Sequence, residues 1–481
     1  DQNNTLGPFR ESVRHRTLLE ARRFSKHEAQ YDPRANICQA WEWGIYSTYF
    51  GRLRCQSAMI LRMRRIPPSG INLFQLIYRL IAQYQEKTGQ EPLNLSLGNP
   101  DGIPPEPIRA LKAAYAANPG FDYHTYAEDR NLRRFAESMV LLHGGIDVAF
   151  FPHLRALPIA GIKTASALIP LACGLHLPTA SRRASFRVAS NLPAYDVVGT
   201  WAHSYLGARR TVWPLVLGDN MSLNVARLKA ALKKDKTNRA DLVFVIRPGN
   251  PAAVGAERTG WLELIHFCLE KRMRLVNDGA YAGLARAGSH VPLAQVAKDF
   301  PDLEWLELYS VSKSFNDPGA RLGAMIGSSD FVEDYILIKG NTDSGPVPGV
   351  MAAYGDFLAD PAAPQKALCA IRGLYEERLA YLIPTLASAG LRPACSTQAG
   401  FFTLWKTPRE AFGKKLPPHN RHEAFNRAVI AETGIVGVHF SGFDDGGKSA
   451  PLIRYAVCAD VLDKTFQARL EEGLARLKPV Y

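Results

Sequence analysis

Ser310-Val-Ser312-Lys313-Ser-Phe-Asn-Asp-Pro-Gly-Ala-Arg321-Leu-Gly323 places a lysine directly after an apolar run and an arginine eight residues later. A lysine at the end of a buried strand can be held in a confined site, where desolvation lowers its pKa and frees the amine for Schiff-base chemistry. The hydroxyls of Ser310 and Ser312 and the guanidinium of Arg321 can together bind a phosphate. Taken alone, the same segment also fits a surface lysine in a polar turn.

Short apolar runs rich in β-forming residues alternate with helical patterns on both sides of this segment. The runs cover residues 241–246, 273–276, 306–311 and 323–326, and each is bounded by Gly, Pro or Asn. This alternation predicts an α/β fold with a mostly parallel sheet covered by helices on both faces. In such sheets ligands gather at the carboxyl ends of the strands. The polar segments described next fall at these ends.

Two further polar segments each follow an apolar run, Arg247-Pro-Gly-Asn250-Pro251 and Asn277-Asp278-Gly-Ala-Tyr281. Together with the lysine segment they resemble the signature of the class I/II aminotransferases, which are pyridoxal-phosphate enzymes of fold type I. The steps of 28 residues from Asn250 to Asp278 and 35 residues from Asp278 to Lys313 are similar to the family's spacing. The resemblance implies a large domain with a seven-stranded sheet and a smaller α+β domain.

The resemblance also implies a role for each of these residues. Lys313 would hold pyridoxal 5'-phosphate as a Schiff base and shuttle the α-proton of the substrate. Asp278 would pair with the pyridine nitrogen, so that the ring accepts the electrons left by that proton. Asn250 and Tyr281 would reach the phenolic oxygen of the cofactor. Lys313, Asp278 and Tyr281 are therefore the predicted catalytic residues, and Ser310, Ser312 and Arg321 join them as cofactor ligands.

Three more segments resemble cofactor-binding parts of the family. Gly161-Ile162-Lys163 opens an apolar helical pattern, so its amides would point from a helix N-terminus at the phosphate, although a plain helix start also fits. Tyr195 would stack on the cofactor face, with a core tyrosine as the alternative. Tyr123 would reach the phosphate bound by a partner subunit. The Gly161 turn is also similar to that of aminotransferases acting on diaminopimelate precursors.

An arginine interrupts the strand-like run Leu452-Ile-Arg454-Tyr-Ala-Val457 near the C-terminus. A charge in such a run is costly unless it is paired. Arg454 resembles the family's arginine that grips the substrate α-carboxylate, and a structural salt bridge is the alternative. Gly98 and Asn250 would complete this substrate-binding set. The sequence departs from the family pattern at Ala252-Ala253 and at Glu128, which puts the local geometry there in doubt.

We therefore expect a homodimeric aminotransferase of amino-acid metabolism that moves an amino group from an amino acid to a 2-oxo acid by a ping-pong route. Because the same cofactor-binding set serves related reactions, a lyase, a decarboxylase or a cyclopropane-carboxylate synthase stays open. A cofactor-sensing transcription regulator is a further alternative, since residues 1–64 are rich in arginine. These residues lack two clear amphipathic helices joined by a tight turn, which disfavours a DNA-binding head and a nucleic-acid partner.

Composition sets the remaining expectations. The 481 residues include 58 Lys and Arg against 45 Asp and Glu, a net charge of +13 that suits anionic small molecules, nucleic acid or an acidic membrane surface. Seven scattered cysteines without a CxxC pair favour a reducing, cytoplasmic location and no metal site. The longest apolar stretch, near residues 165–177, is shorter than the roughly 20 residues that span a bilayer, so no membrane partner is expected.

The predicted organisation has four parts. Residues 1–64 form a basic N-terminal extension, and residues 65–120 the N-terminal part of the small domain. Residues 121–345 form the large cofactor-binding domain, and residues 346–481 the C-terminal part of the small domain. A helix is expected from Leu73 to Gln85, another around Trp261 to Leu269, and a strand from Ala184 to Ala189.

Overall fold

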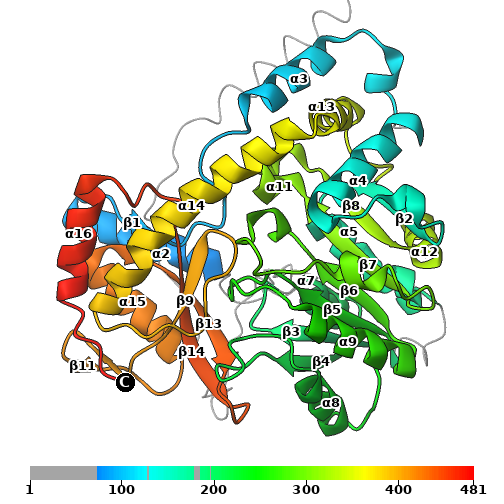
Figure 1. The fold of residues 1–481 in the computed structure, drawn as a ribbon. Coiled ribbons are helices and arrows are strands. Elements are labelled where there is room, and N and C mark those ends of the chain that lie inside the picture. The colour runs from blue at the N-terminus through cyan, green and yellow to red at the C-terminus, as the bar shows by residue number, and fades with distance from the viewer. Residues whose placement is uncertain (1–72, 127–128, 178–184, 196) are drawn as a thin grey trace, which may run out of the picture. The chain divides into compact units, whose positions relative to one another are not determined.

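A computed structural model describes residues 73–126, 129–177, 185–195 and 197–481 (Figure 1). All described residues belong to one compact unit, residues 69–481. The predicted basic extension, residues 1–64, and Glu128 therefore lie outside the described residues. None of the helices within the described ranges is long and apolar enough to cross a membrane.

A seven-stranded sheet forms the centre of the described unit, with the strand order β2–β8–β7–β6–β5–β3–β4. The strands are β2 (Leu154–Ile159), β3 (Arg187–Leu192), β4 (Arg209–Pro214), β5 (Leu242–Ile246), β6 (Arg274–Asp278), β7 (Trp305–Ser310) and β8 (Gly323–Ser328). Neighbours from β7 through β4 run parallel, and β8 is antiparallel to both β7 and β2. The prediction of a mostly parallel seven-stranded sheet is confirmed.

Helices cover both faces of this sheet, which explains why its strands are predominantly apolar. Four helices pack on one face: α4 (Asp129–Gly144), α8 (Val225–Lys234), α9 (Arg258–Lys271) and α13 (Pro348–Ala359). The other face carries α5 (Ile162–Pro170) and α12 (Ser329–Lys339). Along β5, Val243 and Val245 enter the first core, whereas Leu242 and Phe244 enter the second. All five residues of β5 are buried.

A smaller α+β part is built on a three-stranded antiparallel sheet in the order β13–β14–β9. Its elements are α14 (Ala362–Ser388), β9 (Phe402–Lys406), α15 (Arg421–Thr433), β13 (Val438–Phe443), β14 (Ser449–Ala456) and α16 (Lys464–Ala475). The N-terminal helix α2 (Leu73–Thr88) contacts α15, and β1 (Leu93–Asn94) pairs with β12 (Ile435–Val436). Figure 1 shows this blue N-terminal segment beside the orange and red C-terminal elements. The smaller part therefore combines segments from both ends of the described chain, while the domain boundaries stay a prediction.

The expected elements are present with shifted bounds. The helix expected at 73–85 extends to Thr88, and the helix around Trp261 is α9. The strand expected at 184–189 is β3, which begins at Arg187 and ends at Leu192, and part of the expected range lies outside the described residues. The strand expected at 273–276 runs from Arg274 to Asp278.

The carboxyl ends of three neighbouring strands create the edge on which the site is built. In the register of the sheet Ile246 of β5 pairs with Asp278 of β6, and Asp278 pairs with Leu308 of β7. The polar segments that follow these strands therefore begin side by side, although up to 63 residues separate them in the chain.

Candidate active site

Lys313 lies just past the buried strand β7, on the short helix α11 (Val311–Ser314). The hydroxyl of Ser310 caps this helix by accepting a 3.1 Å hydrogen bond from the backbone amide of Ser312. Nζ of Lys313 donates a 2.6 Å hydrogen bond to the carbonyl oxygen of Gly98 and lies 5.6 Å from the centre of the Phe401 ring. Burial, with the charges of Arg454 and Arg321, lowers the pKa of Lys313 to about 8.

Asp278 ends strand β6 on the next position of the same edge. One carboxylate oxygen accepts a 2.9 Å hydrogen bond from the amide of Ala280. Within the described ranges no Lys, Arg or His forms an ion pair with this carboxylate. Burial raises its pKa to about 6, since the charged form loses its hydration. A desolvated carboxylate without a cation is suited to a protonated ring nitrogen.

Three side chains from different elements meet beside Asp278. Asn250 follows β5, Tyr281 follows β6, and Arg454 lies on β14 of the smaller part. Nδ2 of Asn250 lies 3.5 Å from the Tyr281 hydroxyl, and Oδ1 of Asn250 accepts a 2.8 Å hydrogen bond from Nη1 of Arg454. Nη2 of Arg454 donates to the carbonyl oxygen of Ser96 at 2.9 Å, whereas its Nε has no partner among the described residues. Arg454 is only 2% exposed, and burial lowers its pKa. A buried guanidinium bonded only to neutral oxygens fits an incoming carboxylate.

Gly161, α5 and Arg321 form a cradle at the edge of the sheet. Gly161 is the N-cap of α5 and has a φ of 85°. The first backbone amides of this helix, those of Ile162 and Lys163, receive no capping hydrogen bond from a side chain at the N-cap. A Cβ at position 161 would lie 2.7 Å from Nη2 of Arg321, so a larger residue here would require the guanidinium to move. Unfilled helix amides beside a guanidinium make an anion site. These residues fit a phosphate group.

The remaining predicted ligands lie in different surroundings. The amide of Tyr195 donates a 2.7 Å hydrogen bond to the carbonyl oxygen of Asn250, and its side chain is 47% exposed. Tyr123 ends the short helix at Phe121–Tyr123, where its ring packs edge-on against Tyr115 with centroids 4.8 Å apart. The structure therefore brings Tyr195 to the Asn250 turn, while the Tyr123 ring packs against Tyr115 of the preceding helix (Glu106–Ala117) in the single chain.

Sequence reasoning missed several residues of this site. Phe401 lies under Lys313, and Cys458 lies close enough to Lys313 and Arg454 for their charges to lower its thiol pKa, which burial raises to about 12 overall. The buried carboxylate of Glu307 accepts a 2.7 Å hydrogen bond from Nδ2 of Asn277, whose oxygen in turn accepts from the amide of Arg247 at 2.9 Å. In the sequence, Glu307 could have been noticed as an acidic residue within the apolar run 306–311.

The fold and this set of side chains define a pyridoxal-phosphate-dependent transferase of fold type I. The chain belongs to the aminotransferase class I and II family, whose model matches residues 92–466. Family membership confirms the predicted enzyme class, a pyridoxal-phosphate-dependent aminotransferase.

Similar proteins agree with this assignment. The LL-diaminopimelate aminotransferase of Syntrophobacter fumaroxidans is 27% identical over 423 residues, which cover 87% of this chain and 97% of that protein. The LL-diaminopimelate aminotransferase of Moorella thermoacetica is 24% identical over 87% of this chain and 97% of that protein. Among solved structures, the N-succinyldiaminopimelate aminotransferase of Mycobacterium tuberculosis has a TM-score of 0.65 at 20% identity, covering 83% of this chain and 96% of that chain.

Proposed function

We propose that this aminotransferase uses LL-diaminopimelate, or an amino acid that likewise carries a second charged terminus, as one of its substrates. The support is that relatives at 24–27% identity, which this chain matches over almost their whole length, are LL-diaminopimelate aminotransferases. The observation that carries the proposed site is the convergence of Lys313, Asp278 and the Asn250–Arg454 pair on one edge of the sheet. The partner substrate would be a 2-oxo acid.

The residues that would hold the cofactor follow from the chemistry of the donors. Asp278 would face the ring nitrogen, and Asn250 and Tyr281 would face the phenolic oxygen. The amides of Ile162 and Lys163, the hydroxyls of Ser310 and Ser312 and the guanidinium of Arg321 would hold the phosphate. When bound, pyridoxal phosphate supplies an electron sink for the electrons of the substrate Cα–H bond.

The chain's own groups would then act on the substrate. Arg454 would bind the α-carboxylate through its fork of donors, with the Asn250 amide beside it. The amine of Lys313 would attach the cofactor and, once free, take the α-proton and return it. A pKa of about 8 leaves about a tenth of this amine neutral at pH 7, far more than an ordinary lysine, and a general base must be neutral. Phe401 would exclude water beneath it.

A homodimer would complete this site. Ile103, Phe121 and Tyr126, on either side of Tyr123, are 65–77% exposed, and Val347 is 57% exposed. Large apolar side chains gathered near one segment suit a protein interface. A second copy covering them would bring Tyr123 toward its neighbour's phosphate cradle. A cytoplasmic location is proposed as well, on the free thiols of Cys173, Cys268, Cys369, Cys395 and Cys458.

The test is a single half-reaction. Purified protein carrying pyridoxal phosphate is mixed with LL-diaminopimelate, aspartate, glutamate, lysine or phenylalanine, and the visible absorption band is followed. The proposal predicts that LL-diaminopimelate, or another of these amino acids with a second charged terminus, converts the cofactor to its pyridoxamine form faster than phenylalanine does. Faster conversion by an amino acid without a second charged terminus would overturn the substrate assignment. Conversion by none of them would overturn the aminotransferase reading of this site.

A further inference from the structure

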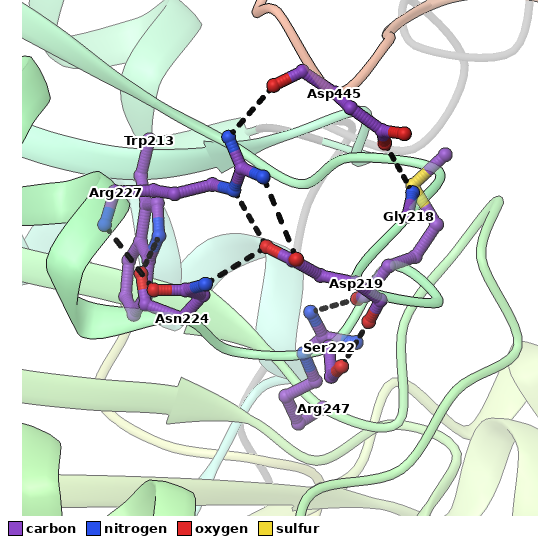
Figure 2. Close-up of polar contacts among 9 residues, drawn as sticks. Trp213, Gly218, Asp219, Ser222, Asn224, Arg227, Arg247 and Asp445 are labelled. Atoms are coloured by element: carbon purple, nitrogen blue, oxygen red, sulfur yellow. Dashed lines mark hydrogen bonds and ion pairs between the residues drawn. The ribbon is translucent and has the colours of Figure 1, made fainter.

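Residues 217–224 lie in the loop between β4 of the large sheet and α8, and they contact the hairpin formed by β13 and β14 (Figure 2). We call these residues the brace loop. The amide of Leu217 donates to the carbonyl oxygen of Phe443 at 3.3 Å, and the amide of Gly218 donates to the carboxylate of Asp445. Phe443 and Asp445 lie at the turn of the hairpin, whose second strand carries Arg454.

Arg227 fastens the brace loop to this turn. Its guanidinium forms an ion pair with Asp219 of the loop, and Nη1 donates a 3.1 Å hydrogen bond to the carbonyl oxygen of Asp445. Asn224 donates to the same Asp219 carboxylate at 2.9 Å and caps α8 through the amide of Arg227. One guanidinium thus bridges the loop and the hairpin, as Figure 2 shows.

Arg247 contacts the middle of the brace loop. It is fully buried and forms no ion pair with a described acidic residue. Its Nη2 donates to the carbonyl oxygen of Met221 at 2.6 Å, and its Nη1 to that of Val254 at 3.3 Å. Met221 and its neighbour Asn220 have φ values of 57° and 50°, which is unfavourable for residues with a side chain. The bond from Arg247 helps to hold this backbone conformation.

These contacts connect the two residues of the proposed carboxylate site, Asn250 and Arg454, through the brace loop. Arg247 begins the turn that ends in Asn250, and the hairpin turn leads along β14 to Arg454. Asn250 and Arg454 meet directly through their 2.8 Å hydrogen bond. The distance between Asn250 and Arg454 is therefore fixed in two ways. Their direct hydrogen bond fixes it, and so do the contacts of the brace loop with the Arg247 side chain and the hairpin turn.

We propose that the brace loop positions the α-carboxylate site, with Arg227 and Arg247 as positioning residues that act through Arg454 and Asn250. The inference rests on the proposed function, in which Arg454 binds the carboxylate. A guanidinium fork binds a carboxylate strongly only when both donors are aligned, so a small shift of β14 would weaken binding. Lys313, Asp278 and α5 belong to other elements, and Arg227 contacts the hairpin turn rather than the Asn250 turn, so loss of Arg227 alone would leave the cofactor held as before.

The test compares Arg227→Met and Arg227→Lys with wild type. Arg227 is partly exposed, so its loss is tolerated better than that of buried Arg247. In Arg227→Met the KM values for the amino acid and the 2-oxo acid should rise roughly tenfold, with kcat changed less than about threefold. Arg227→Lys should recover part of the loss. The visible spectrum and the cofactor dissociation constant should match those of wild type.

A binding measurement removes turnover from the comparison. 2-Oxoglutarate carries an α-carboxylate but no amino group, so its binding to the pyridoxal form can be measured by calorimetry. Its dissociation constant should rise roughly tenfold in Arg227→Met. The control is Arg427→Met, which breaks an exposed ion pair with Glu423 on α15 and should leave every value unchanged.

Two results would overturn the brace loop as a positioning element. One is a loss of stability in Arg227→Met with unchanged KM and 2-oxoglutarate binding, which would make the ion pair merely structural. The other is an equal effect of Arg427→Met. The wild type alone tests the proposed function, because it either transaminates or does not, whereas the ratio of variant to wild type tests the brace loop.

Discussion

Nζ of Lys313 donates a 2.6 Å hydrogen bond to the carbonyl oxygen of Gly98, 215 residues away in the chain. Lys313 follows β7 of the large sheet, whereas Gly98 follows β1, which pairs with β12 in the smaller part. The amine therefore lies where the two parts meet. Its only described oxygen partner is a neutral carbonyl, which stabilises the ammonium less than a carboxylate would.

The lowered pKa of Lys313 makes cofactor attachment depend on pH. Because the neutral amine is the nucleophile, the rate at which cofactor-free protein develops the visible band should rise with pH and reach half its maximum near pH 8. Stopped-flow absorbance between pH 6.5 and 10 measures this rate. A rate that still rises steeply at pH 10, as the ordinary lysine pKa of 10.5 would give, would mean that burial does not act on this amine.

Asp278 should make the stability of the cofactor-free protein fall between about pH 4 and 6. Its pKa rises from 3.8 to about 6 on folding, so the folded chain keeps a proton that the unfolded chain has already lost. Stability is then lost as pH rises through this window, by on the order of 2–3 kcal/mol from this group. Asp278→Asn cannot titrate, so urea unfolding should show it gaining stability relative to wild type from pH 4 to 6. A difference that stays constant with pH would contradict the assignment.

Gly161→Ala should weaken cofactor retention. The added Cβ would displace the Arg321 guanidinium, and the residue has φ of 85°. Gly207→Ala is the matched control, since Gly207 has φ of 74° but open space around its Cβ position. Both pay a backbone cost of about 1 kcal/mol. Only Gly161→Ala should raise the cofactor dissociation constant, by at least about tenfold. Equal effects would assign the loss to the backbone alone.

Arg454→Lys should raise KM for both substrates on the order of 10- to 100-fold, because an ammonium cannot replace a planar fork that also bonds Asn250 and Ser96. Arg187→Lys serves as control. Arg187 is also buried on a strand, but it bonds Thr211 and Asp235 at the opposite end of β3. Steady-state kinetics that change equally in both variants would remove Arg454 from the substrate site.

The sequence predicts the central sheet well because its strands are covered on both faces and so appear as short, predominantly apolar runs. Asn250, Asp278 and Lys313 each follow such a run, so the parallel order of β5, β6 and β7 brings them together. The pattern of an apolar run followed by a polar residue is therefore enough to predict that these residues lie at the same edge of the sheet.

Other parts of the site depend on packing between distant segments, which no local pattern records. Cys458 and Phe401 reach Lys313 only because the smaller part folds against the carboxyl edge of the large sheet. The brace loop reads in sequence as an ordinary turn, and its contacts with Asp445 appear only once the hairpin is placed. The role of Tyr123 depends on a second chain, so it stays a prediction.

The most direct test of the account is to identify the lysine to which the cofactor is attached. The protein carrying pyridoxal phosphate is reduced with borohydride, digested and examined by mass spectrometry, with Lys313→Ala treated in parallel. We predict that the phosphopyridoxyl mass is found on the peptide containing Lys313 and is lost in the variant, which should also lose transamination by at least about 1000-fold. Finding the mass on another lysine, such as Lys163, or finding full activity in Lys313→Ala, would contradict the account.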